Sequence, residues 1–450
     1  DYVILKTDGD IAYIALPFIQ EYTNMEYSVE QEPNRAIITS KWGEIETAEV
    51  KKDTQVRYLG GVKSPILTEV KKSDKVTVLE DEDDWMKVAT ADGYVGYIKT
   101  KSLKKQKKEK TSRDFTEPVY SNMTEDHSIN MAWHNVTNVA ANNAVQQVLA
   151  STSGLTTIAP TWFSLADTEG NISSIADADY VNYAHTAGLE VWAVFRDFHG
   201  GTNSYDETYE TLRYTSKRAK LEDQVVAAAV AAGVDGINLD FELISSKCGV
   251  HYVQLVRELS VKCHQNNLVF SVDNYVPQSY NSHYDLKEQG IVADYVVIMA
   301  FDEHTEGPYD AGSVASISYL QDGIEKTLKK VSADKVIAGI PFFTRLWFET
   351  AKSSEQLSEE AGTEAASYPN KVSSKALGME EAAQSVVNAG ATAQWDEKTQ
   401  QNYAKWSADG GTYRIWLEDA QSLEAKLKVI QGNKLAGVAE WSLGREESSV

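Results

Sequence analysis

The stretch Gly233-Val-Asp-Gly-Ile-Asn-Leu-Asp-Phe-Glu-Leu243 alternates as a single β-strand does. Asn238, Asp240 and Glu242 point to one face, because successive side chains of a strand point to opposite sides, and apolar residues occupy the other face. Neighbouring polar side chains on such a face lie about 6–7 Å apart. Acid and amide groups are costly to bury without partners, so this face is either solvated or functional.

The spacing of this stretch excludes a calcium-binding loop. If Asn238 were the first ligand, Leu243 would stand at the sixth position, which requires Gly, and Gly249 at the twelfth, which requires Glu. A solvated surface strand remains an alternative, although the neighbouring expected strands are apolar runs. We favour an acid pair at the carboxyl end of a barrel strand, where catalytic residues of such folds collect.

After Pro118 the pattern changes to apolar runs separated by helical stretches, which predicts parallel strands joined by crossover helices. Near-continuous apolar runs are expected of strands that are covered on both faces. Eight such strands predict an α/β fold, a (β/α)8 TIM barrel over residues 118–450, with its active site at the carboxyl ends of the strands. The expected strands are Ile129–Trp133, Thr157–Trp162, Glu190–Phe195, Gly236–Phe241, Val269–Asp273, Tyr295–Phe301, Val336–Pro341 and Gly437–Trp441.

The segment between the last two expected strands is too long for one crossover connection. It contains helix signals and the strand-like run Thr412–Leu417. We therefore expect a small α/β insertion at about 348–420, beside the mouth of the active site.

Small β-rich domains are expected before the barrel. Residues 1–62 alternate between apolar and polar side chains with polar turns and predict a small N-terminal domain. Residues 63–104 contain several short strands and the hairpin signal Asp92-Gly93. Residues 105–117 are rich in lysine and almost free of apolar side chains, so we expect an exposed basic linker.

The bulk composition limits the possible partners. The formal net charge of -23 argues against nucleic acid and against adsorption to anionic lipid. No apolar run approaches the ~20 residues needed to cross a bilayer. Cys248 and Cys263 lie near the two ends of an expected helix of about 22 Å, too far apart for a disulfide, so both should be free thiols. The chain opens at Asp1 without a signal-like segment, as a secreted protein would after cleavage or a trimmed chain would, so location is inferred from the domains.

Two N-terminal segments resemble known bacterial domains. The order of the acidic turn Asp81–Asp84, Trp85 with Val88, and the run Gly93–Ile98 resembles bacterial Src-homology-3-like domains. Those domains commonly attach wall-degrading enzymes to cell walls, which implies a wall tether. The alternative is that the aromatic residues only fill the core of a small barrel. Residues 1–62 resemble the N-terminal region of copper amine oxidases, but no copper is implied, because the first histidine is His127.

The pattern D-G-x-x-x-D-x-E of Asp235, Gly236, Asp240 and Glu242 resembles the fourth-strand signature of glycoside hydrolase family 18, the chitinase-like enzymes. The resemblance implies that Glu242 is the general acid and that Asp240 orients the 2-acetamido group of the substrate, which attacks the anomeric carbon. Many family members carry Asp where this chain has Asn238. We expect Asn238 to keep a hydrogen-bonding neighbour for Asp240 and to reduce its like-charge coupling.

Three further segments agree with this family. The family motif M-x-Y-D is met by Met299 and Asp302, but Phe301 replaces the Tyr whose hydroxyl helps to hold the substrate, a donor worth about 0.5–1.5 kcal/mol. Arg345 lies in a G-x-P-x-x-x-R-x-W segment. Trp441 stands where the family keeps the Trp beneath the cleaved sugar, unless it only packs the barrel. The candidate catalytic residues are Glu242, Asp240, Asn238 and Asp302, and the candidate substrate-binding residues are Trp441, Met299, Phe301, Asp235, Trp133 and Arg345.

The resemblance covers about 116–446 and implies retaining, substrate-assisted hydrolysis of β-1,4 linkages at N-acetylglucosamine in peptidoglycan or chitin-type glycans. It implies a polysaccharide partner, no metal or organic cofactor, a monomer, and an extracellular, cell-wall or spore location. Two alternatives stay open. One is a catalytically silent sugar-binding barrel, and the other is wall adhesion through the N-terminal domains with the barrel as a scaffold.

Overall fold

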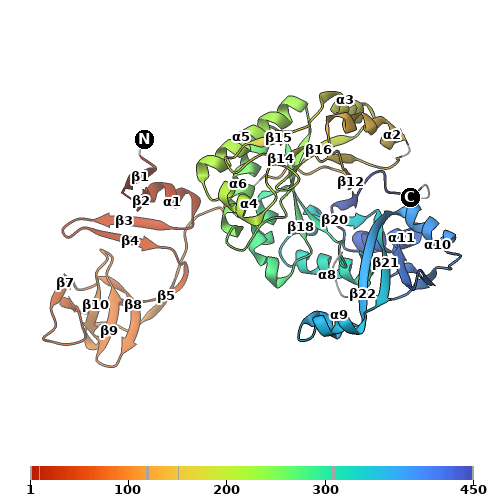
Figure 1. Ribbon diagram of the computed structural model, residues 1–450. Coiled ribbons are helices and arrows are strands. Elements are labelled where there is room, and N and C mark those ends of the chain that lie inside the picture. Colours follow the sequence, from red (N-terminus) through yellow and green to blue (C-terminus); the bar gives the residue numbers. More distant parts are fainter. Residues whose placement is uncertain (1–2, 10, 118–120, 151, 306–309, 448–450) are drawn as a thin grey trace. The chain divides into compact units, whose positions relative to one another are not determined.

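The computed structural model describes all residues except 1–2, 10, 118–120, 151, 306–309 and 448–450. The chain forms two compact units, Asp1–Val119 and Tyr120–Val450 (Figure 1). The boundary expected at residue 118 falls outside the described residues. Within the described parts, no helix combines the length and the apolar character needed to cross a membrane.

The small unit contains one antiparallel sheet of seven strands in the order β11-β5-β8-β9-β10-β6-β7. Its core is aliphatic, with Val56, Val88 and Ile98 fully buried. The sheet strands are β5 (Gly43–Glu49), β6 (Thr54–Arg57), β7 (Ile66–Val70), β8 (Lys75–Glu82), β9 (Trp85–Ala89), β10 (Val95–Lys99) and β11 (Lys107–Thr111). Two hairpins and a helix precede it: β1 (Leu5–Asp8), β2 (Ile11–Ile14), α1 (Leu16–Tyr22), β3 (Glu26–Glu30) and β4 (Arg35–Thr39).

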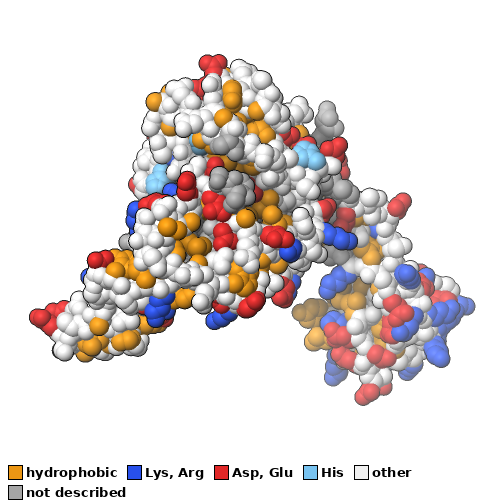
Figure 2. Space-filling model, turned by 90° about the vertical axis from the view of Figure 1, so that its right-hand side faces the viewer, with side chains coloured by type: hydrophobic (Ala, Val, Ile, Leu, Met, Phe, Trp, Pro, Cys, Tyr) orange, Lys and Arg blue, Asp and Glu red, His pale blue; other side chains and the backbone are white. Residues whose placement is uncertain are grey.

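The structure divides this region differently from the sequence prediction. The expected boundary between residues 62 and 63 runs through the sheet, because β5 and β6 pair with later strands. The expected linker contains β11, which pairs with β5. Lys108 and Lys110 lie opposite Glu46 and Glu44 of β5. Lys108 forms an ion pair with Glu44 at 2.7 Å. Opposite charges across a ladder are favourable, so a charge run can form a strand here. Figure 2 shows basic and acidic side chains interleaved over this unit.

The aromatic residues of the small unit do not fill its core. Trp85, Tyr94 and Tyr97 are all only half-buried. Trp85 lines a surface pocket of about 430 Å³ and lies 5.6 Å from the ammonium of Lys99, measured to the ring centre. The interpretation of these rings as core residues is therefore wrong for this sheet.

The large unit is a closed barrel of eight parallel strands surrounded by helices (Figure 1). All eight strands expected from the sequence are confirmed, and pairing of the second strand with the third closes the ring. A short hairpin, β14 (Phe163–Leu165) and β15 (Ile172–Ser174), pairs through β14 with the third barrel strand. The barrel strands are β12 (Ile129–His134), β13 (Thr157–Pro160), β16 (Glu190–Arg196), β17 (Gly236–Asp240), β18 (Val269–Tyr275), β19 (Tyr295–Met299), β20 (Val336–Pro341) and β26 (Gly437–Trp441).

The connections between these strands are helical, as the pattern predicts. Gly233 has a φ of 78° and caps the long helix before β17, a left-handed position that glycine adopts without strain. Both cysteines are buried free thiols at the two ends of α6, as predicted. The helices are α2 (Val145–Ala150), α3 (Ala178–Thr186), α4 (Tyr205–Leu212), α5 (Thr215–Ala232), α6 (Gly249–Gln265), α7 (Leu286–Val292), α8 (Ile317–Leu328) and α11 (Ala420–Gly432).

The insertion lies between β20 and β26, as expected, and begins earlier than residue 348 because β21 follows β20 almost directly. It forms a five-stranded antiparallel sheet in the order β22-β21-β25-β24-β23, with α10 packed against it. Its elements are β21 (Phe343–Ala351), α9 (Ser354–Glu359), β22 (Asn370–Gly378), α10 (Met379–Asn388), β23 (Gln394–Asp396), β24 (Gln401–Ala408) and β25 (Gly411–Leu417).

Candidate active site

The acid pair lies at the carboxyl end of β17, inside the barrel mouth. Asn238 is fully buried, Asp240 is 7% exposed, and Glu242 follows the strand and is half-buried. The intervening Leu239 and Phe241 belong to the outer core between the strands and the helices. The predicted alternation is therefore confirmed, and it places the three polar side chains on the inner face.

The backbone of Glu242 is fixed by two buried side chains. Its N–H donates to Oδ1 of Asp197 at 2.9 Å, and its carbonyl accepts from the hydroxyl of Tyr284 at 3.1 Å. Its side chain accepts a short hydrogen bond from the hydroxyl of Tyr275, through Oε2. These contacts set the direction of the carboxyl group before any substrate binds.

The surroundings of Glu242 favour a protonated carboxyl. Burial raises its pKa, the hydrogen bond from Tyr275 lowers it, and the charge of Asp302 raises it again. Burial also raises the pKa of Asp197 to about 7. A carboxyl group whose pKa is raised by burial suits a general acid.

Asn238 is held by three partners and leaves nothing for Asp240. Its Nδ2 donates to Oδ1 of Asp273 at 2.7 Å and to Oγ of Ser271 at 3.0 Å. Its Oδ1 accepts from Nε1 of Trp133 at 3.0 Å. Both N–H donors of Asn238 are engaged by β18, so neither is directed to Asp240, contrary to the expectation.

Like-charge coupling at Asp240 persists although position 238 carries no acid. Burial raises the pKa of Asp240 well above its usual range, and the charges of Glu242, Asp273 and Asp197 raise it further. Asp273 lies on β18, beside the strand that carries Asn238, and its own pKa is raised well above its usual range by burial. The carboxyl group missing at position 238 thus has a counterpart on the neighbouring strand.

One oxygen of Asp240 is buried without a partner. Among the described residues, none donates a hydrogen bond to its Oδ1. An unpaired buried acceptor is costly unless a ligand supplies the donor. The N–H of a 2-acetamido group is a donor of the right kind.

Asp302 and its neighbours form one side of the site. Asp302 follows β19 in a left-handed conformation, with a φ of 59°. Its side chain is open to solvent, yet burial of the surrounding site raises its pKa and the charge of Arg345 lowers it. Nη1 of Arg345 donates to Oγ of Ser374 at 3.0 Å. The structure thus brings Arg345, from the insertion, close to an acid of the barrel.

An aromatic cluster closes the bottom of the mouth. The ring of Trp133 lies 5.9 Å from Trp441 and 6.3 Å from Phe301, both edge-on. Trp441 is partly exposed and can stack against a sugar, and Met299 and Phe301 are partly buried beside the same cluster. Trp133 is 2% exposed. Its ring is therefore closed to a sugar, and its Nε1 donates to Asn238.

Asp235 is not part of this site. It precedes β17, at the opposite end of the strand from Glu242, and Asp235 and Asp240 are about 16 Å apart at the usual rise. Its Oδ2 pairs with His185 at 2.8 Å and accepts from the N–H of Val191 at 2.8 Å. Its role is to tie the amino ends of β16 and β17 to α3, so the prediction that it binds substrate is not supported.

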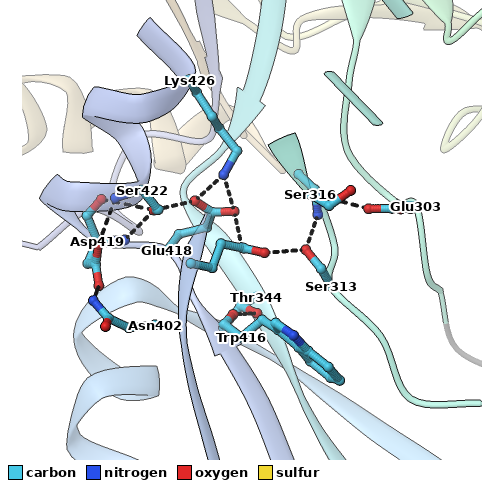
Figure 3. A network of polar contacts seen from close by, with 12 residues as sticks. Glu303, Ser313, Ser316, Thr344, Asn402, Trp416, Glu418, Asp419, Ser422 and Lys426 are labelled. Atoms are coloured by element: carbon cyan, nitrogen blue, oxygen red, sulfur yellow. Dashed lines mark hydrogen bonds and ion pairs between the residues drawn. The ribbon is translucent and has the colours of Figure 1, made fainter. Parts of the chain in front are cut away.

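Polar contacts anchor the insertion to the loop that carries Asp302 (Figure 3). Glu418 and Lys426 form a buried ion pair at 2.8 Å. Gln401 donates to Glu418 at 2.7 Å and accepts from the hydroxyl of Ser313. The carbonyl of Val314, next to Ser313, accepts from the N–H of Glu303 at 2.8 Å. Glu303 directly follows Asp302. A series of contacts that begins in α11 therefore holds the loop that carries Asp302.

Four residues of the site escaped the sequence prediction. Asp273 and Tyr275 alternate with Ser271 on β18, the same signal that identified the acid pair, but their strand was judged as an apolar run. Arg196 ends β16 and Asp197 follows it, at the end of the strand where a barrel places functional groups. Strand alternation applied to every strand would have found the first two, and strand position the others.

Fold and site together define a TIM-barrel glycosidase architecture with an acid pair after the fourth strand. Residues 198–446 match the glycosyl hydrolases family 18, and residues 51–104 match the bacterial SH3 domain. The chain belongs to glycosyl hydrolase family 18, and it is a glycoside hydrolase with an N-terminal bacterial SH3 domain.

Relatives from Bacillus subtilis (strain 168) are distant. The chain is 24% identical over 291 residues to the uncharacterized glycosylase YvbX, and the match covers 62% of this chain and 78% of that protein. It is 27% identical over 239 residues to the cortical fragment-lytic enzyme, and the match spans only about half of either protein, 51% of each. The fold matches that of the C-terminal domain of a putative chitinase from Desulfitobacterium hafniense DCB-2, with a TM-score of 0.61 and 18% identity over 72% of this chain and 96% of that one.

Proposed function

We propose that this protein cleaves β-1,4 linkages at N-acetylglucosamine by a retaining, substrate-assisted reaction, in peptidoglycan or a chitin-type glycan. The observation that carries the proposal is the pairing of two unlike carboxyl groups on one strand end. Glu242 is half-buried and reachable, whereas Asp240 is buried and has an oxygen without a donor. One can exchange a proton with substrate and water, and the other can only hold a substrate group.

In the first step Glu242 donates its proton to the glycosidic oxygen as the bond to the anomeric carbon breaks. The carbonyl oxygen of the 2-acetamido group forms a bond to the same carbon and gives a cyclic oxazolinium ion. Asp240 accepts a hydrogen bond from the acetamido N–H and stabilises the positive charge. Tyr275 donates to the Glu242 carboxylate that remains, so the carboxylate formed by proton transfer has a ready partner.

In the second step water attacks the anomeric carbon from the face that the leaving group vacated. Glu242 takes the proton of that water, the ring opens, and the acid is restored. The product keeps the β configuration. A direct displacement by Asp240 is disfavoured because its carboxyl is buried beneath the mouth, and a two-carboxylate inverting reaction would need a second base about 6.5–9.5 Å from Glu242.

The substrate is assigned to bacterial wall glycan by association. A cortical fragment-lytic enzyme is among the relatives, and the bacterial SH3 domain is of a class that resembles wall-attachment modules. We propose that the small unit holds the barrel near insoluble wall, outside the cell or at the spore. The alternative of a silent sugar-binding barrel is less favoured, because the acid residue Glu242 is retained and fixed in place.

The proposal is tested on purified peptidoglycan and chitin, with reducing ends identified by mass spectrometry and product anomers followed by proton NMR. We expect N-acetylglucosamine at the new reducing ends and the β anomer first. A first-formed α anomer would overturn the substrate-assisted mechanism. Absence of cleavage of either polymer, together with retained binding, would favour the silent sugar-binding alternative.

A further inference from the structure

Arg196 is a cation inside the barrel mouth that the reaction as described does not use. It is the last residue of β16, where Trp192 and Val194 face the barrel interior and Phe195 faces the outer helices. Because side chains alternate along a strand, Arg196 points inward. It is paired in register with Asp240 of β17 and is half-buried. Its guanidinium therefore stands beside the acid pair.

The guanidinium of Arg196 has no acceptor in the described part of the protein. Its Nε is buried and forms no hydrogen bond, and no ion pair joins Arg196 to any described residue. Its contact with the ring of Phe198 is long, at 5.6 Å to the centroid. Asp240 attracts it without forming an ion pair. By contrast, the buried Arg218 donates to Glu258 and to the carbonyl of Leu212.

An arginine without an acceptor from the protein is suited to bind an acceptor from a ligand. A guanidinium presents a planar fork of N–H donors that matches a carboxylate in two parallel bonds. The buried Nε of Arg196 lacks an acceptor at a cost, and that cost is recovered when a ligand supplies an anion. A neutral sugar hydroxyl or amide oxygen can accept one bond but brings no charge. A fixed cation favours such an anion in a site that is otherwise lined by carboxyl groups.

We propose that Arg196 binds a carboxylate of the substrate and thereby selects peptidoglycan over chitin. The inference rests on the proposed hydrolysis at N-acetylglucosamine and names its substrate class. N-acetylmuramic acid carries a lactyl carboxylate, free or extended by a peptide with carboxylates of its own, whereas chitin carries none. Arg196 is a specificity residue in this assignment, and Glu242 and Asp240 remain the reacting groups.

The competing explanation is that Arg196 only stabilises the charge of Asp240. Loss of Arg196 would then affect every substrate alike and would shift the pH dependence of turnover equally for each. A carboxylate-binding role instead depends on the charge of the substrate. The two roles are separated by a pair of substrates that differ only at the carboxylate.

The matched substrates are peptide-free peptidoglycan strands with free lactyl carboxylates and the same strands after conversion of those carboxylates to methyl amides. Equilibrium binding is measured with the Glu242→Gln protein, and in that background with Arg196→Gln and Arg196→Lys. We expect Arg196→Gln to weaken binding of the charged strands on the order of 10- to 100-fold more than binding of the amidated strands, the range of a charge-assisted hydrogen bond. Arg196→Lys should recover part of the preference, because it keeps the charge and loses the fork.

Arg257→Gln is the matched control, because it removes the same charge from the exposed outer face of α6, where Arg257 pairs with Glu288. It should leave the charged-to-amidated ratio unchanged. Equal weakening of both strands by Arg196→Gln would overturn the inference, as would a ratio that Arg257→Gln changes by the same factor. Turnover by the protein with Glu242 intact is a separate readout: its absence would refute the proposed hydrolysis, while the binding ratio would still decide the role of Arg196.

Discussion

The buried ion pair of Glu418 and Lys426 offers a test of how the insertion supports the barrel (Figure 3). Glu418 is 0% exposed and Lys426 is 1% exposed, and the ammonium donates to both carboxylate oxygens, at 2.9 and 2.8 Å. Lys426→Met keeps the length of the side chain and removes the charge. Glu418 would then lie buried with only Gln401 and Ser422 as donors.

Breaking a buried pair from one side costs about 3–5 kcal/mol. Two donors remain on Glu418, so we expect the lower half of this range, about 3 kcal/mol. The second variant, Lys426→Met with Glu418→Gln, removes both charges and should cost less than Lys426→Met alone. The matched control is Lys428→Met on the same helix, because Lys428 and its partner Glu424 are 69% and 67% exposed. An exposed pair of this kind contributes little to stability, because water screens the charges.

The cost of Lys426→Met should depend on pH in a defined direction. Burial raises the pKa of Glu418 and Lys426 lowers it, so removing Lys426 raises the folded-state pKa further above the unfolded value. A carboxyl group of this kind is protonated on folding, and the stability of the variant is lost as pH rises above the unfolded pKa. Urea unfolding of the barrel unit at pH 5 and pH 8 should therefore show the larger penalty at pH 8.

Three results would refute this reasoning. One is a penalty for Lys426→Met no larger than that for Lys428→Met, and another is a larger penalty at pH 5. The third concerns function, because Gln401 links the pair to Ser313 and so to the loop of Asp302. We expect kcat to fall together with stability, and an unchanged kcat in folded Lys426→Met protein would show that the loop is held by other contacts.

Glu242→Gln should lower kcat on the order of 10²–10⁴-fold while preserving fold and glycan binding, because the amide cannot donate the proton. Turnover and circular dichroism test this prediction. Near-normal activity would show that Glu242 is not the general acid. Tyr275→Phe removes a hydrogen bond that lowers the pKa of Glu242, so the basic limb of the kcat/KM profile should move to higher pH; a move to lower pH would contradict the assignment. Removal of residues 1–117 should spare hydrolysis of small soluble oligomers and reduce action on insoluble wall. Equal losses on both substrates would show instead that the small unit supports the barrel.

The barrel could be predicted from the sequence because each of its strands is a separate apolar run between helical stretches. The inner polar face of β17 followed from alternation within a single strand, which needs no tertiary information. The strand β11 did not, because a run of lysines becomes a strand only beside the glutamates of β5, and that partner lies far away in sequence. Asp235 was misplaced because a motif gives spacing and not the end of the barrel at which a residue lies.

The charge balance of the site shows the same limit at its centre. Viewed on one strand, Asn238 is a missing acid, and Asp240 should titrate alone. The structure places an acid, Asp273, on the neighbouring strand β18. One oxygen of Asp273 accepts from the amide of Asn238, and the other has no partner among the described residues. Asp240 and Asp273 are buried near Glu242, and these three carboxyl groups cannot all be ionised together at low cost. Protons are therefore shared across two strands. The protonation state of Asp240 therefore depends on groups from two adjacent strands. A substitution of Asn238 reveals it only when Asp273 is substituted as well.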